Sequence, residues 1–86
     1  MPVIAKFYGI VIRMLFHNTL PASFHALYEQ WELVVGISPL RIIQGEAPAR
    51  VCEMVMEWAR EHQRELMENW ECCQQAVAPR HIAPLY

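Results

Sequence analysis

Apolar and polar residues alternate along the first half of the chain. From Ile10 to Phe16 apolar side chains recur at every second position, which is the period of a β-strand. Gly9 marks a bend or bulge near the start of this stretch. Loop and turn residues then separate further apolar runs. The predicted strands are 3–16, 23–28, 31–37 and 40–43, with Gln44-Gly45-Glu46 as a break. The first half therefore predicts an antiparallel β-meander of about four strands.

A helical period replaces this alternation after Pro48, a residue suited to the first turn of a helix. At 100° per residue one narrow stripe is mostly apolar and the opposite side is charged, as in an amphipathic helix. The stripe contains Val51, Val55, Trp58, His62, Leu66, Asn69 and Cys73. About 28 helical residues would span roughly 42 Å, which exceeds a small sheet. We therefore expect the last turns to overhang the sheet, or a break near His62 to Arg64.

These patterns predict a single α+β domain over residues 1–86. The meander occupies 1–45, one long C-terminal helix 46–75, and an extended tail 76–86. Ile82, Leu85 and Tyr86 suggest that the tail docks on the fold. The apolar fraction of 55% is high for a chain this small, because a small core cannot bury it all. We therefore expect a homo-oligomer, most simply a dimer.

One helix can cover only one face of the meander. If Glu29-Gln30 is the turn, Tyr28 faces Trp31 and the neighbouring pairs are Ala26 with Leu33 and Phe24 with Val35. The other face would then be open, and it mixes apolar with cationic and polar residues. It would carry Val11, Leu15, Leu27 and Val34 beside Arg13, His17, Ser23, His25 and Glu32. This face is the predicted binding surface, unless the tail or a second copy of the chain covers it.

Charge and cysteine content narrow the function classes. The net charge of −2 disfavours a general nucleic-acid binder. No stretch approaches the roughly 20 apolar residues of a membrane span, and no signal peptide is visible, so no membrane partner is expected. Three cysteines and no secretory signal favour reduced thiols in the cytoplasm. The chain contains no aspartate, which removes many acid–base and metal-site designs.

Few side chains are suited to chemistry. His17 and His25 bracket a loop, and two imidazoles can perform acid–base work near neutral pH. A metal site needs more ligands than they supply, so we expect no metal and no cofactor. His62 lies in the apolar stripe and is interpreted as a core histidine. Cys72-Cys73 lack the Cys-x-x-Cys spacing, and Trp70, at the edge of the stripe, is a candidate anchor for a partner.

Several segments together resemble a known bacterial family, catalogued as domain of unknown function 4160. Pro21-Ala22-Ser23-Phe24-His25-Ala26 is similar to its signature Pro-Pro-His-Phe-His-Ala, with Ser23 in place of the first histidine and Ala22 in place of the second proline. Other similar segments are Met1–Ile4, Phe7–Met14, Glu57–Ala59, His62, Glu65-Leu66, Glu68–Trp70, Ile82 and Pro84-Leu85. Members are small bacterial proteins suspected of belonging to toxin–antitoxin-like pairs. The resemblance thus implies a small cognate protein as partner and assigns no activity.

Three function classes follow from these observations. The first is a non-enzymatic interaction protein that acts through the open face and the end of the helix, as a component of a toxin–antitoxin-like pair. The alternative is a small ribonuclease-like toxin, in which histidine acts as base and Arg13 stabilises phosphate charge, with His17 and His25 as the histidines. A ligand- or metal-binding module on the same face is a third possibility.

Overall fold

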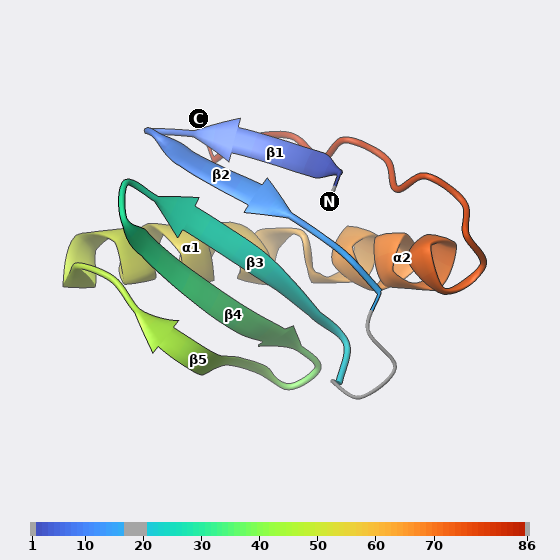
Figure 1. Cartoon of the computed structure of the whole chain (residues 1–86), viewed down its shortest axis with the longest axis horizontal. Helices are drawn as coiled ribbons and strands as arrows, with labels where there is room; N and C mark the ends of the chain where they lie inside the picture. The colour runs from blue at the N-terminus through green and yellow to red at the C-terminus, as the bar shows by residue number, and fades with distance from the viewer. Residues whose placement is uncertain (1, 17–20, 86) are drawn as a thin grey trace.

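The fold is a five-stranded antiparallel sheet with two helices on one of its faces (Figure 1). A computed structural model describes residues 2–16 and 21–85. The strands lie in chain order and every neighbouring pair is antiparallel. The elements are β1 (Val3–Phe7), β2 (Ile10–Arg13), β3 (Ser23–Tyr28), β4 (Trp31–Ile37), β5 (Leu40–Glu46), α1 (Ala49–Glu61) and α2 (Gln63–Gln74).

The predicted first strand is two strands joined by a hairpin. Tyr8 and Gly9 both have positive φ, +50° and +80°, as a type I′ turn requires. This mirror-image turn matches the twist of the strands beside it, and Gly9 adopts the conformation without strain. Phe7 therefore pairs with Ile10. β-branched and aromatic residues lie on both sides of the turn, so the sequence showed a bend at Gly9 but not the reversal of the chain.

The predicted turn between β3 and β4 is confirmed. Glu29 has a φ of +53°, and Tyr28 pairs with Trp31 across the turn. The remaining pairs of this hairpin include Ala26 with Leu33 and Phe24 with Val35. The register that divides β3 and β4 into two faces is thus the expected one.

The expected break at residues 44–46 is wrong, because β5 continues through it. One extra residue, Ile43, is inserted between the partners of Val34 and Val35, forming a β-bulge. Gly45 follows with a φ of +86°, and a Cβ there would overlap the Glu32 carbonyl oxygen. A glycine that looked like a strand terminator is instead the residue that lets β5 stay close to β4.

The helical half consists of two helices rather than one. His62 separates α1 from α2 with φ −121° and ψ 22°, so the expected break near His62 to Arg64 is confirmed. Gln63 donates from Nε2 to the Ile37 carbonyl at 2.6 Å and attaches this junction to the end of β4. The apolar stripe faces the sheet as predicted. Its fully buried members include Val55, Trp58 and Leu66.

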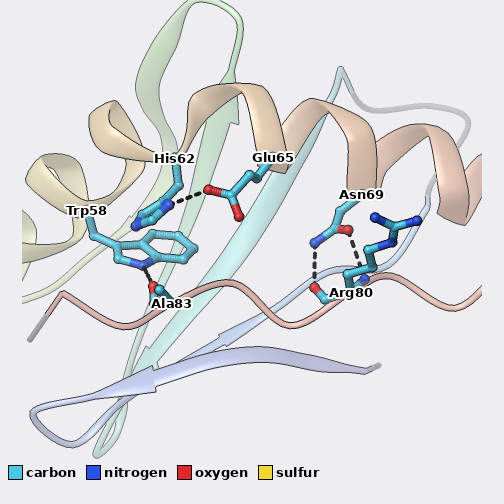
Figure 2. Close-up of polar contacts among 6 residues, drawn as sticks. All are labelled: Trp58, His62, Glu65, Asn69, Arg80 and Ala83. Carbon is cyan, nitrogen blue, oxygen red and sulfur yellow. Dashed lines mark hydrogen bonds and ion pairs between the residues drawn. The ribbon is translucent and has the colours of Figure 1, made fainter.

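The tail after α2 closes the core along the edge of β1. Trp58 donates from Nε1 to the Ala83 carbonyl at 2.8 Å, and Asn69 exchanges two hydrogen bonds with the backbone of Arg80 (Figure 2). Ile82 donates its backbone N–H to the Ile4 carbonyl at 2.8 Å. Ile82 and Leu85 are buried, which confirms that the tail docks; Tyr86 lies outside the residues that the structure describes. Because it lies on the helix side, no described segment crosses the other face of the sheet (Figure 1).

Candidate functional site

The uncovered side of the sheet, here called the open face, consists of three rows of paired residues. Directly paired residues of antiparallel strands project to the same side, so the register defines each row. One row crosses all five strands: Lys6, Val11, Leu27, Glu32 and Glu46. The second contains Val3, Arg13, His25, Val34 and Gln44. The third contains Ser23, Gly36 and Arg41. Val11, Leu27 and Val34 form an apolar strip on this face, and polar residues at the ends of the rows, among them Lys6, Arg41 and Glu46, lie around it.

A small polar cluster lies near the middle of the open face. Arg13 and His25 are direct neighbours across β2 and β3, and His25 Nδ1 lies 2.9 Å from Glu32 Oε2. An ionised carboxylate only accepts hydrogen bonds, so His25 donates from Nδ1 to Glu32. The other ring nitrogen, Nε2, takes no part in this pair. The His25 side chain is 20% exposed and that of Glu32 is 50% exposed. The imidazole is therefore oriented by a carboxylate and still reaches solvent.

Arg13 is the least satisfied member of this cluster. Its Nε is buried and has no hydrogen-bond partner among the residues that the structure describes. A buried N–H without an acceptor costs about 1–3 kcal/mol. Because arginine stays charged and presents several donors in a planar fork, the group best able to satisfy it is a carboxylate or a phosphate. The cluster can thus bind an oxyanion, or orient one beside an imidazole.

The predicted binding residues differ in how accessible they are. Val11 and Leu27 are partly exposed on the open face, as expected. Ser23 and Val34 also lie on it but are 3% and 6% exposed, so neither offers much surface to a ligand. Leu15 follows the end of β2 and is outside the rows. His17 lies outside the residues that the structure describes.

Trp70 is a core residue and not the exposed anchor that its position in the stripe suggested. It is 6% exposed and packs against Phe16, with ring centroids 5.3 Å apart. Phe16, which follows β2, lies against this end of α2, and a helical period cannot reveal such a contact. Its large surface is therefore used within the chain.

His62 is partly buried at the helix junction. Its ring lies against Trp58, with centroids 5.5 Å apart, and its Nδ1 is 2.6 Å from Glu65 Oε1 (Figure 2). The pair is local, three residues apart on the chain, and its Glu65 side chain is half exposed. This agrees with the interpretation of His62 as a structural histidine with a side-chain partner.

Two hollows flank the tail, and neither was expected from the sequence. One of about 360 Å³ lies between α2 and the tail and is lined by carboxylates, including Glu65 and Glu68, together with Arg80 and His81. The other, of about 460 Å³, is largely apolar and is lined by Leu15, Phe16, Cys73, Val77 and their neighbours. Burial, and secondarily the adjacent Cys72, raises the pKa of the Cys73 thiol. Only the docked tail creates these hollows, so no local sequence signal marks them.

Sequence reasoning also missed Lys6, Gln44 and Glu46 on the open face. The missing signals were the hairpin at Tyr8-Gly9, which aligns Lys6 with Val11, and the extension of β5 past its bulge. Across residues 2–16 and 21–85, no three His, Cys or Glu side chains gather as metal ligands would. No helix in these described ranges is long and apolar enough to cross a membrane.

Comparison with known proteins gives a family and no further relative. Searches of curated proteins and of solved structures found no protein similar to this chain. The family resemblance described above rests on segments in β1 to β3, in both helices and in the tail. A family model described as a domain of unknown function, DUF4160, matches residues 9–71, well over half of the chain, and the protein belongs to that family.

Proposed function

We propose that this protein is a non-enzymatic binding protein whose open face holds an acidic segment of a small partner protein. The observation that carries the proposal is the buried, unsatisfied Nε of Arg13 on a face that no described segment covers. In this proposal Arg13 turns toward the partner on binding, so that the buried Nε gains a carboxylate as its acceptor. Val11 and Leu27, on either side of the β2–β3 pairing, supply apolar contact area beside it.

Membership of the family supports a protein partner over other ligands. The resemblance to suspected toxin–antitoxin-like components implies a small cognate protein. The open face carries Lys6, Arg13 and Arg41 against Glu32 and Glu46, so its charge is too nearly balanced to favour a long polyanion such as RNA. An interface with one buried arginine in an apolar surround is a common arrangement of strong binding residues. In this proposal the chain is one component of such a pair, with a cytoplasmic partner.

The test is capture of a partner from native bacterial lysate with the whole chain as bait, compared across variants. Arg13→Met keeps the apolar stem and removes the charge, and Leu27→Asp places a carboxylate on the same face. Arg60→Met, an exposed arginine on α1, is the matched control. A partner at near-equal stoichiometry should bind the wild type and the control, and at least tenfold less should bind either open-face variant.

Two outcomes would contradict the proposal. One is a lysate of the source bacterium that yields no stoichiometric partner. The other is a partner that Arg13→Met and Leu27→Asp retain as well as the wild type does. Circular dichroism of each variant distinguishes lost binding from lost folding, because neither substituted side chain belongs to the core cluster.

A ribonuclease-like activity is the second candidate, favoured by the pairing of His25 with Glu32. An imidazole held through Nδ1 by a carboxylate presents Nε2 as an acid or base, and the adjacent Arg13 could stabilise charge on a phosphate. Incubation of purified protein with RNA, beside His25→Ala and Glu32→Gln, tests this candidate. Cleavage that is absent, or equal in all three proteins, would remove it.

A further inference from the structure

The two edges of the sheet differ in how they are protected. At the β1 edge, the tail reaches the sheet through the hydrogen bond from Ile82 to the Ile4 carbonyl. At the opposite edge, no backbone hydrogen bond in the described part of the chain joins β5 to anything except β4. An edge strand of seven residues thus presents unpaired backbone groups along its outer side, which is a template for another strand.

The composition of β5 leaves this edge available. Five of its seven residues are exposed, and Ile42, at 39% exposure, is one of the large exposed apolar side chains of the chain. The strand contains neither proline nor lysine, residues that commonly protect an edge from pairing. Its two charges have opposite sign and lie near opposite ends, at Arg41 and Glu46.

The bulge decides which residues of β5 share a face. Arg41 pairs with Gly36 on the open-face side, and Glu46 pairs with Glu32 on that same side. The two are five positions apart, so a regular strand would place them on opposite faces. Ile43, the inserted residue, restores them to one face. Its own side chain lies over Gly36 on the open face, where a Cβ would meet Ile43 Cδ1 at 3.2 Å.

We propose that the outer edge of β5 pairs in antiparallel fashion with β5 of a second copy of the chain. In the proposed register, open-face residues of one β5 lie opposite open-face residues of the other. Arg41 then lies opposite the partner's Glu46, and Ile42 lies opposite the partner's Gly45. Two-fold symmetry produces each pair twice, giving two Arg–Glu pairs per dimer. A shift of one residue would place Arg41 opposite Gly45 and mismatch the faces. The interface joins the two sheets into one of ten strands and leaves both open faces available to partners.

A charge swap tests this interface. The oligomeric state of the whole chain is measured by sedimentation equilibrium over a concentration series. Dimer formation raises the average molecular mass from 10.1 kDa toward twice that value. Arg41→Glu and Glu46→Arg each create two like-charge pairs per dimer, so each should raise the dimer dissociation constant at least tenfold. The double variant restores opposite charges in reversed order and should return that constant to within about threefold of the wild type. The wild-type dimer should also weaken as salt rises.

The matched control is Arg60→Glu, which reverses an exposed charge on α1 and should leave the dissociation constant unchanged. A chain that stays monomeric throughout the series overturns the proposal. So does a dimer that survives either single variant, or one that the double variant fails to restore. Arg13→Met does not alter β5, and the charge swap does not alter Arg13. Loss of partner capture in Arg13→Met and weakening of the dimer by the charge swap are therefore separate results, and either can fail without the other.

Discussion

Asn69 provides the sharpest test of how the tail is held. Its side chain is 3% exposed. Its Nδ2 donates to the Arg80 carbonyl at 2.8 Å, and its Oδ1 accepts from the Arg80 amide at 2.9 Å (Figure 2). One buried side-chain amide thus pairs with both backbone groups of a tail residue, as a neighbouring strand would. Its loss should therefore weaken the docking of the whole tail.

The expected magnitude follows from these two bonds. A hydrogen bond contributes about 1 kcal/mol net, so Asn69→Ala should lower the free energy of unfolding by about 2 kcal/mol. The entropy of unfolding is about 2.1 cal/mol/K per residue near the midpoint, which gives roughly 180 cal/mol/K for this chain of 86 residues. The melting temperature of Asn69→Ala should then fall by roughly 11 °C.

Calorimetry or circular dichroism measures this change, with Gln74→Ala as control because Gln74 is exposed on the same helix. The control should stay within about 0.5 kcal/mol of the wild type, or about 3 °C. Asn69→Asp keeps the acceptor but turns a carboxylate oxygen toward the Arg80 carbonyl. Its free energy of unfolding should therefore fall by at least the contribution of one hydrogen bond, about 1 kcal/mol. Hydrogen exchange at the Arg80 amide should accelerate in Asn69→Ala. A melting temperature for Asn69→Ala as close to wild type as the control would refute the reasoning.

Three further predictions concern other parts of the fold. Gly9→Ala should cost about 1–2 kcal/mol for its positive φ alone, whereas Gly45→Ala should cost at least twice as much in thermal unfolding, because its Cβ would overlap the Glu32 carbonyl. Trp58→Phe should lose about 2 kcal/mol in urea titration, from its bond to the tail and from the smaller ring. Burial, and then Cys72, raises the pKa of the Cys73 thiol above its ordinary 9.0. The folded state therefore keeps a proton that the unfolded chain loses, so wild-type stability should fall more than that of Cys73→Ser as pH rises above 9.0.

Local patterns predicted the fold class and much of the pairing. The two-residue period and the Glu29-Gln30 turn located β3 and β4 in their observed register. The helical stripe identified the buried face, and its length indicated the break that occurs at His62. The misassigned segments were those in which the same residues suit two structures. Strand-forming residues lie on both sides of the Tyr8-Gly9 hairpin and are equally compatible with one long strand. Gly45 serves equally as a strand end or as the positive-φ residue beside a bulge.

The candidate site divides in the same way. The sequence by itself determined that an open face exists and that Arg13, His25 and Glu32 share it, because side-chain alternation depends only on register. Only the tertiary structure decided that Arg13 Nε is buried without a described partner, that Trp70 is packed against Phe16, and that the tail docks on the helix side. These outcomes depend on which distant segments meet. Contacts between segments far apart in the chain follow from the packing of the whole core, which no local period encodes.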